Sequence, residues 1–420
     1  MMKRPWLSFR YVAENYRNYS TTPNVTSNQK LKILKDAYLC EGKYRSSVEM
    51  ANDLAQNIVY YDKKNDTSGL IVINKPAGVP LKTSKDGLGL EDAMPDLSKL
   101  LGLEKITVIK SVNKYASGCV LLASKEQGVS QLKRSLNRRN QLSEHCLGES
   151  YFALTNNTPR KSSIQETVDV LHKEIQSHGS TMLEPVIERI LVSNKLFKCR
   201  DQKLKRISVN AEIVSKSTKG QSTLVKIEPS SLQYSFIQIY MADLLSPIIG
   251  DSIYGHRAKM MMGKMVKVNP ELLPDVNSRL QNLPESMLSK LGLRSGEEHI
   301  LPLHLHLGRI HLPGYFGGSK HLTIHAPPRP FFKGTAEMLN IDIPEHIVED
   351  KNVRDYNLVR KRKKEKEPTN EVLNPELSNI AEETPETDGQ LPIRTLKERK
   401  TLKERKEERR WDRNRQSFTT

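Results

Sequence analysis

The chain has 420 residues, with 66 lysine and arginine residues against 49 aspartate and glutamate residues, a formal charge of +17 and a pI near 9.5. Its apolar runs are much shorter than the ~18 residues that cross a membrane, and its four cysteines lack CxxC spacing, which argues against a disulfide scaffold, a zinc ribbon or a thioredoxin-type site. The excess positive charge instead predicts a polyanionic partner.

Residues 1–30 have the composition of a mitochondrial targeting segment. They contain five basic residues and one acidic residue, and Lys3, Arg10 and Arg17 recur every seven residues, on one face of a helix. An amphipathic, basic, acid-poor N-terminus predicts a transit peptide, with a frayed tail as the alternative. We therefore expect the protein in the mitochondrial matrix, with no membrane partner.

We expect residues 31–60 to form an N-terminal extension and residues 61–345 to form a folded domain. Residues 127–140 predict a helix, because Val129, Leu132 and Leu136 form an apolar stripe. Short apolar runs predict strands at 69–74, 107–109, 119–122, 151–154, 222–227 and 236–239. Helices and strands do not alternate regularly, so we expect an α+β fold on a long, mixed and mainly antiparallel sheet with flanking helices.

Residues 346–420 form a tail of alternating charge blocks. A basic block at 360–364 is followed by an acidic segment at 367–388 and by two copies of Thr-Leu-Lys-Glu-Arg-Lys at 395–406. Such blocks, with few apolar residues, predict disorder. From residue 351 onward the tail has 19 basic and 14 acidic residues, so it carries only +5 of the +17, and most of the excess charge lies elsewhere.

Common catalytic and cofactor motifs are missing from the sequence. It contains no Rossmann glycine pattern, no Walker-type Gly-Lys-Ser/Thr and no Gly-x-Ser-x-Gly. His304, His306 and His311 have the right chemistry for a metal. In a strand His304 and His306 would share a face, but no third ligand to join these two has a recognisable spacing, and histidines of a sheet or pocket are the alternative. We expect neither a metal nor a cofactor.

Several distinctive segments follow one another in a fixed order over about residues 65–340. They are Ile71-Val-Ile-Asn-Lys-Pro-Ala-Gly-Val-Pro80, Lys114-Tyr-Ala-Ser-Gly-Cys-Val-Leu-Leu-Ala-Ser-Lys125, Ser150-Tyr-Phe-Ala-Leu154, Pro247-Ile-Ile-Gly-Asp-Ser-Ile-Tyr-Gly255, Leu303-His304 and Ile324-His-Ala-Pro-Pro-Arg-Pro330. Together they resemble the motifs of RluA-type RNA pseudouridine synthases, and within that family the mitochondrial RPUSD-type group with altered catalytic motifs.

The resemblance implies a pseudouridine synthase fold with an RNA-binding cleft. It also implies a reaction in which the glycosidic bond of a uridine in RNA is cleaved and the base rejoined through carbon 5, without a cofactor. In the family an aspartate acts at the ribose, an arginine pairs with that aspartate, and a tyrosine packs on the base.

The family's charged pair has no charged counterpart at the matching positions. Counting from the motifs, Asn113 stands at the aspartate position and Gln238 at the arginine position, while Tyr151 retains the tyrosine and Glu149 replaces a lysine. A primary amide lacks the basicity and nucleophilicity of a carboxylate, but two amides can hydrogen-bond to each other. We therefore expect a neutral pocket that does not isomerise uridine, unless Asp92 or Asp96 serves from a nearby loop.

RNA binding does not need the lost acid. Basic residues cluster in sequence around these motifs and can contact phosphates: Lys75, Lys110, Lys114, Lys133, Arg134, Arg138 and Arg139. A solvated helix face is the alternative for Lys133 and Arg134. We expect an RNA-binding protein of mitochondrial RNA maturation or ribosome assembly, whose partners are mitochondrial mRNA or rRNA and ribosome assembly proteins. The alternatives are an active synthase and an interaction factor that works through its charged tail.

Overall fold

The computed structural model describes residues 26–62, 69–84, 87–141, 148–177, 180–189, 204–218, 220–269, 281–317 and 320–348. Residues 1–25 of the predicted transit peptide and residues 349–420 of the predicted tail lie outside the described residues.

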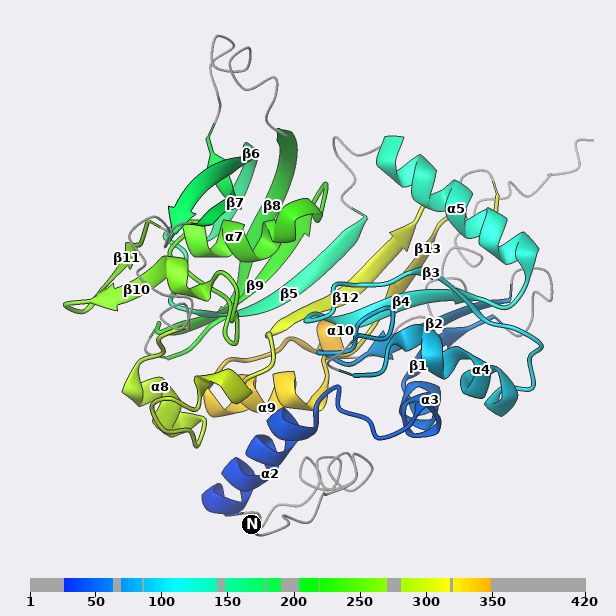
Figure 1. Cartoon of the computed structure of the whole chain (residues 1–420), viewed down its shortest axis with the longest axis horizontal. Coiled ribbons are helices and arrows are strands. Elements are labelled where there is room, and N and C mark those ends of the chain that lie inside the picture. Colours follow the sequence, from blue (N-terminus) through cyan, green and yellow to red (C-terminus); the bar gives the residue numbers. More distant parts are fainter. Residues whose placement is uncertain are drawn as a thin grey trace, which may run out of the picture. The chain divides into compact units, whose positions relative to one another are not determined.

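One mixed sheet of eleven strands organises the described residues (Figure 1). Its strands are β1 Ile58–Tyr61, β2 Leu70–Lys75, β3 Thr107–Lys110, β4 Ser117–Ala123, β5 Glu149–Asn156, β6 Ser163–Ser177, β7 Ser180–Glu188, β8 Lys205–Lys216, β9 Ser222–Pro229, β12 Leu305–Leu312 and β13 Leu322–His325. They follow the order β1-β2-β4-β12-β5-β9-β8-β6-β7, with β3 also paired to β4 and β13 to β12. Among these pairs β4–β12 is parallel and the others are antiparallel. The expected mixed, mainly antiparallel α+β sheet is confirmed.

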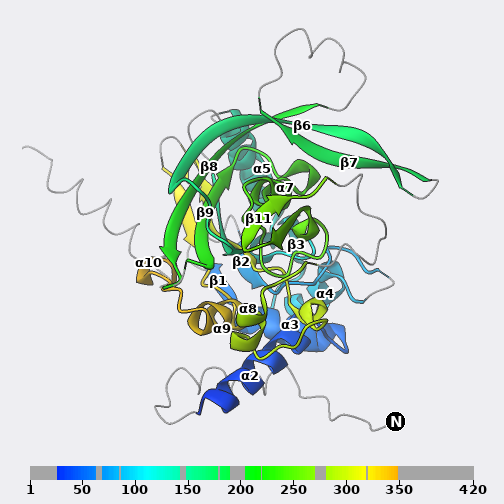
Figure 2. The same cartoon turned by 90° about the vertical axis from the view of Figure 1, so that its left-hand side faces the viewer.

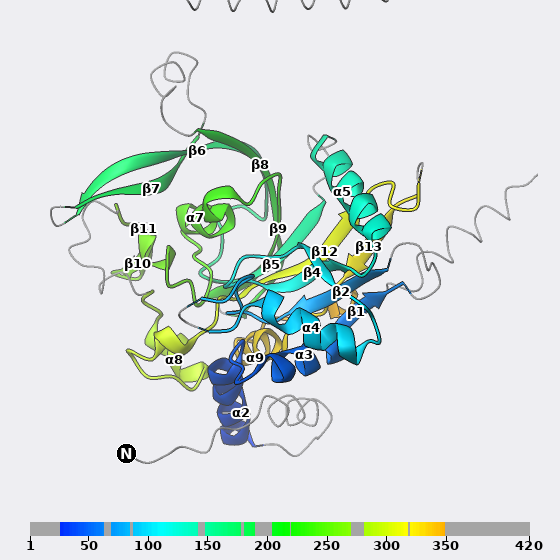
Figure 3. The same cartoon turned by 45° about the vertical axis from the view of Figure 1, so that its right-hand side comes forward.

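Helices cover both faces of this sheet. They include α2 Ser27–Cys40, α3 Ser47–Gln56, α4 Leu90–Leu100, α5 Glu126–Gln141, α7 Phe236–Asp243, α8 Glu285–Lys290, α9 Pro330–Met338 and α10 Glu345–Val348. α3 packs against β2 and α4, whereas α5 packs against β3, β4 and β12. Figures 1 and 3 show α5 on the opposite side of the sheet from α3 and α4. Every residue of β2 and β4 is buried, as expected for strands covered on both faces.

The predicted helix at 127–140 is confirmed as α5. Its apolar stripe faces the core: Leu132 is fully buried, and Val129 and Leu136 pack against the same apolar cluster. None of the described helices combines the length and the hydropathy that a membrane crossing requires.

The strand predicted at 236–239 is wrong, because this run forms the first turn of α7. All four residues of the run are buried. An alternation of buried and exposed positions, which would distinguish a helix from a strand, is therefore absent from it. Figure 2 shows α7 beside the curved β6–β9 part of the sheet. There the Tyr240 hydroxyl donates to Glu166 of β6 at 2.8 Å.

Residues 31–60 belong to the folded domain and are not an extension of it. They contain most of α2, all of α3 and the start of β1. Met50 and Leu54 of α3 lie in the same core cluster as Leu70 of β2, and α2 packs against α9. The domain boundary that we placed at residue 61 therefore falls inside the folded unit.

Candidate functional site

The loop between β3 and β4 carries Asn113, at the position where the resemblance expects an aspartate. Its side-chain oxygen accepts a hydrogen bond from Tyr115 N at 3.2 Å, and its backbone oxygen accepts one from Ala116 N at 3.2 Å. Asn113 is exposed, whereas the neighbouring Val112 is buried in the core and anchors the loop. The amide oxygen thus closes a local turn of the kind that asparagine readily forms.

Lys75 lies inside the protein, under this loop. Its side chain is fully buried, and its ammonium donates to the backbone oxygens of Pro76 at 2.9 Å, Val79 at 2.9 Å and Lys114 at 3.2 Å. The backbone of Gly78 also donates to Lys114 O, at 2.9 Å. Lys75 therefore fastens the turn after β2 to the loop that carries Asn113. Because its three N–H groups point at carbonyl oxygens, Lys75 is not available to a phosphate.

The burial of Lys75 predicts a pH-dependent stability. Burial lowers the pKa of Lys75 from 10.5 to about 7, Glu41 opposes this shift, and Arg329 adds to it. The unfolded chain therefore holds more protons between pH 7 and pH 10, and raising the pH through this window stabilises the fold. From pH 7 to pH 9, the free energy of unfolding of the wild type should rise by about 2 kcal/mol relative to that of Lys75→Met.

Urea unfolding of both proteins at the two pH values measures this difference. Lys105→Met, at an exposed lysine, is the matched control and should follow the wild type. If Lys75→Met showed the same change with pH as the wild type, the titration of Lys75 would not be its cause.

Tyr151 lies in β5 and is coupled to an ion pair. Its hydroxyl donates to one carboxylate oxygen of Glu149 at 3.0 Å, and the other carboxylate oxygen pairs with Lys110 at the end of β3. Residues 149 and 151 share a face of the strand, because side chains alternate along it. The Lys110 side chain is only 20% exposed, so a phosphate would have to compete with Glu149 for it.

Gln238 is buried on α7 and bonds to an aspartate from another motif. Its side-chain amide donates to Asp251 Oδ1 at 2.9 Å, and the same oxygen accepts from the backbone of Ile253 and Tyr254 at 3.0 Å each. Burial raises the pKa of Asp251, and these donors oppose that shift. The predicted hydrogen bond between Gln238 and Asn113 is wrong. The Gln238 amide donates to Asp251, and the Asn113 amide oxygen accepts from Tyr115 N.

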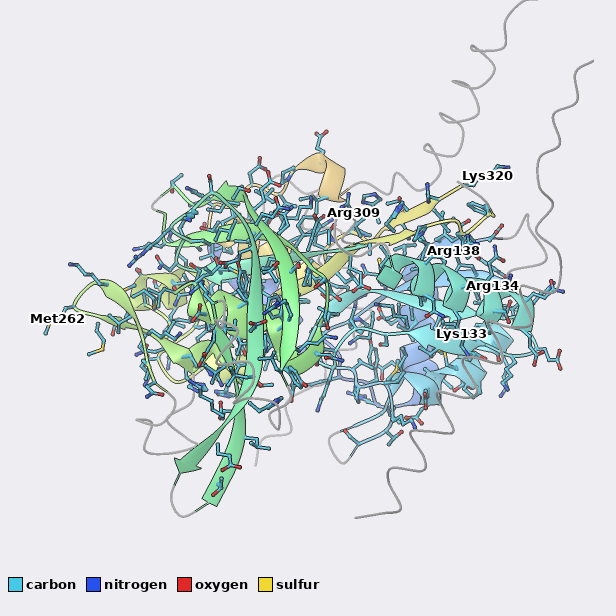
Figure 4. The ribbon with its side chains drawn as sticks, turned by 90° about the horizontal axis from the view of Figure 1, so that it is seen from above. Lys133, Arg134, Arg138, Met262, Arg309 and Lys320 are labelled. Atoms are coloured by element: carbon cyan, nitrogen blue, oxygen red, sulfur yellow. The ribbon has the colours of Figure 1, made fainter. Side chains whose placement is uncertain are left out.

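α5 carries an exposed basic face. Lys133, Arg134 and Arg138 are exposed, and apart from Glu126 at its first position this helix contains no acidic residue. Figure 4 shows these three side chains on α5. Lys320, also exposed, lies in the loop between β12 and β13, and α5 packs against β12.

The other predicted phosphate contacts differ in their surroundings. Lys114 is partly exposed, and its ammonium lies 5.5 Å from the centre of the Tyr115 ring. The side chain of Arg139 lies outside the described residues. Of the seven predicted contacts, Lys133, Arg134 and Arg138 are thus exposed together on α5, whereas Lys75 is buried and Lys110 is paired with Glu149.

The histidines with metal-binding chemistry lie in and beside β12. His304 Nε2 is 2.7 Å from Thr335 Oγ1, and His306 Nε2 is 3.0 Å from the backbone oxygen of Ala326. Burial lowers the pKa of both rings to about 4, so both are neutral at pH 7. Among the described residues no three His, Cys, Asp or Glu side chains group as metal ligands.

A buried network of three charged side chains was not predicted from the sequence. Arg329, which precedes α9, lies 3.4 Å from Glu41 and 3.4 Å from Asp53, and all three side chains are buried. Glu41 also accepts a hydrogen bond from the backbone of Ala77 at 3.0 Å. The network therefore connects α2 and α3 to the turn that Lys75 fastens. Arg329 lies inside the Ile324–Pro330 motif, but Glu41 and Asp53 lie outside the motifs that we identified in the sequence.

We compared the chain with known proteins. No family model matches it. The "Mitochondrial mRNA pseudouridine synthase Rpusd3" of Mus musculus is 30% identical over 276 residues (65% of this chain, 75% of the relative), and the RPUSD3 of Homo sapiens is 28% identical over 278 residues (65% and 74%). The "Pseudouridylate synthase RPUSD4, mitochondrial" of Danio rerio is 26% identical over 327 residues (76% and 79%).

A solved structure gives the same fold. "Human RNA Pseudouridylate Synthase Domain Containing 4" matches with a TM-score of 0.51 at 22% identity, over 71% of this chain and 98% of that one. The sheet described above, the order of the motifs and these relatives lead to one assignment. The chain belongs to the RluA-type family of RNA pseudouridine synthases, with relatives among the mitochondrial RPUSD proteins.

Proposed function

We propose that this protein binds RNA in the mitochondrial matrix and acts in RNA maturation or ribosome assembly without isomerising uridine. Its relatives include proteins named mitochondrial mRNA pseudouridine synthases, which supports the location and the RNA partner. Mitochondrial mRNA or rRNA is the proposed ligand, and ribosome assembly proteins are proposed as further partners.

The observation that carries the proposal is the chemistry of residue 113. Its side-chain oxygen already accepts a hydrogen bond from Tyr115 N, and an amide can neither attack the ribose nor remove a proton as an ionised carboxylate does. Gln238 is neutral as well and bonds to Asp251. In a buried site, an arginine without its acidic partner typically costs about 3–5 kcal/mol. This cost does not arise here, because both positions are neutral.

RNA affinity has a separate source, the exposed basic face of α5. Contacts from lysine and arginine to phosphates give affinity that is independent of sequence and falls with salt. Lys133, Arg134 and Arg138 lie on a helix that is fixed to the sheet: the Ser135 hydroxyl donates to Pro313 O at 2.9 Å, and Leu132 is fully buried. A rigid helix holds the three charges in one place, which favours repeated contacts along a backbone.

An active synthase for mitochondrial mRNA or rRNA is the second candidate, favoured by the names of the relatives. Such activity would need a carboxylate other than residue 113. Asp92 and Asp96 have structural contacts on α4, since Asp92 accepts from Gly89 N at 2.7 Å and Asp96 accepts from Ser47 Oγ at 2.6 Å. These contacts favour the binding role over catalysis from α4.

Two variants test the proposal. In cells that carry only Asn113→Ala, the pseudouridine map of mitochondrial RNA should not change. In the purified triple variant Lys133→Gln, Arg134→Gln, Arg138→Gln, binding to RNA should weaken, and the magnitude of the slope of log K against log salt should fall by about 2, at ~0.7 per lost single-strand contact.

A second triple variant controls for net charge. Lys82→Gln, Lys99→Gln, Lys105→Gln removes the same charge from exposed lysines in and around α4, and it should bind RNA like the wild type. Loss of a specific pseudouridine in Asn113→Ala, with the protein level unchanged, would establish the active synthase instead. RNA binding that is insensitive to salt would remove the case for phosphate contacts on α5.

A further inference from the structure

The hairpin formed by β10 Ala258–Met261 and β11 Lys264–Lys267 stands apart from the main sheet as a two-stranded pair. Its base is anchored through Arg257, which donates to Pro185 O at 2.7 Å, pairs with Glu184 and lies 4.7 Å from the ring centre of Tyr254. Figure 4 shows Met262, at the tip, pointing away from the protein. The hairpin is thus a projection on a fixed base.

The tip is apolar and exposed. Met262 is 102% exposed and Met261 57% exposed. Met262 also has a φ of +49° and is followed by Gly263 with a φ of +74°. Two-residue hairpin turns with positive φ at both positions strongly favour Asn-Gly or Asp-Gly. Methionine at position 262 therefore contributes neither burial nor turn stability to the hairpin, so its side chain is available to a partner.

The charge of the hairpin indicates which class of molecule it would bind. Residues 258–267 contain three lysines and no acid. Lys267 pairs with Asp243, whereas Lys259 and Lys264 have no acidic partner within the described residues. In the register, Met261 lies opposite Lys264, so an apolar and a cationic side chain are adjacent on one face. An apolar groove of another protein would fit the methionines but leave these lysines without partners, whereas RNA offers both phosphates and base faces.

We propose that the β10–β11 hairpin is a finger that contacts single-stranded RNA, with Lys259 and Lys264 at phosphates and Met261 and Met262 against unstacked bases. Methionine is among the apolar side chains that proteins insert between bases, and its flexible, polarisable thioether adapts to aromatic surfaces. The inference rests on the RNA binding proposed above. In Figure 4 Met262 and the α5 residues lie at opposite sides of the molecule, so this contact is separate from α5.

The test uses the full chain and a fluorescent 20-nucleotide oligouridine, with affinity measured by anisotropy at several salt concentrations. The double variant Met261→Thr, Met262→Asn keeps the hairpin, because threonine suits strands and asparagine suits the turn. Its melting temperature should equal or exceed that of the wild type, while its affinity should fall about fivefold, as expected for the loss of roughly one apolar contact. Leu183→Asn, at a 64% exposed leucine of β7, is the control and should bind like the wild type.

The outcomes separate the finger from RNA binding in general. If the methionine variant binds oligouridine like the wild type while the α5 triple variant binds more weakly, RNA binding stands and the finger is overturned. If the wild type does not bind oligouridine or mitochondrial RNA, the proposed function fails and the finger with it. If the methionine variant loses only a protein partner, the hairpin is a protein-docking surface and the finger is overturned.

Discussion

Arg329→Met should destabilise the folded domain by about 3–5 kcal/mol, the cost of leaving buried charges without their partner. The Arg329 guanidinium is buried between Glu41 and Asp53, at 3.4 Å from each. Hydrogen bonds from Ala77 N to Glu41 and from the Tyr44 hydroxyl to Asp53 remain in the variant, but they cannot neutralise two desolvated carboxylates. Equilibrium unfolding in urea at pH 7 measures the loss.

Two further variants identify buried charge as the cause. Lys35→Met breaks the ion pair with Glu297, which is 2.9 Å long and about one third exposed, and should cost no more than about 1 kcal/mol. Adding Glu41→Gln and Asp53→Asn to Arg329→Met removes every charge of the trio and should restore most of the stability. Equal losses for Arg329→Met and Lys35→Met would show that burial of the network has no special cost.

The Arg329→Met variant should also respond to pH. Burial already raises the pKa of Glu41 in the wild type, and the Arg329 charge opposes that shift. Without the Arg329 charge, burial should raise the pKa of Glu41 further, so the folded state would bind a proton at Glu41 more tightly than the unfolded chain does. The stability deficit should therefore shrink as the pH falls from 7 to 5.

Gly118→Ala should cost about 3 kcal/mol or more, because a β-carbon has no room at the contact between β4 and β12. Gly118 has a φ of +118°, and its β-carbon would lie 2.3 Å from the backbone oxygen of Leu307 and 2.6 Å from its nitrogen. Gly118 of β4 is paired with Leu307 of β12 on one side and with Lys75 of β2 on the other. Backbone atoms held by two neighbouring strands cannot move aside.

Gly102→Ala is the matched control for this prediction. Gly102 also has a positive φ, of +67°, but a β-carbon there meets nothing within 4 Å. Gly102→Ala should therefore lower the free energy of unfolding by only about 1–2 kcal/mol, the cost of a positive φ for a residue with a β-carbon. Urea midpoints of both variants against the wild type measure the difference. Equal losses would mean that backbone conformation, and not the contact with Leu307, explains the need for glycine at position 118.

The features that sequence could predict are those with a local signal. The apolar stripe of α5 has a clear helical period, and the buried runs of β2 and β4 are bounded by turns. The run at 236–239 has no such signal, because all four of its residues are buried in the helix α7, which packs against β7. The helices before residue 61 were missed because their role as part of the core depends on contacts with β2 and α9.

Motif spacing predicted Asn113, Tyr151 and Gln238 as site residues, but it could not predict their hydrogen-bond partners. Asn113 and Gln238 do not bond to each other. Asn113 accepts a hydrogen bond from Tyr115, and Gln238 donates one to Asp251. Glu149 pairs with Lys110, 39 positions away, as well as accepting a hydrogen bond from Tyr151. Hydrogen-bond partners depend on the direction of each side chain in the folded state, and the order of motifs does not contain that direction.

The sequence by itself predicted the family and the mixed, mainly antiparallel α+β fold, and its composition determined the basic character of the chain. The tertiary structure alone decided which basic side chains are exposed. Lys75 is enclosed by three carbonyls and Lys110 is paired with Glu149, whereas Lys133, Arg134 and Arg138 of α5 and Lys264 of the β10–β11 hairpin are exposed. The physical reason is that burial and ion pairing arise between segments far apart in the chain, as with Arg329 and Asp53, which are separated by 276 positions.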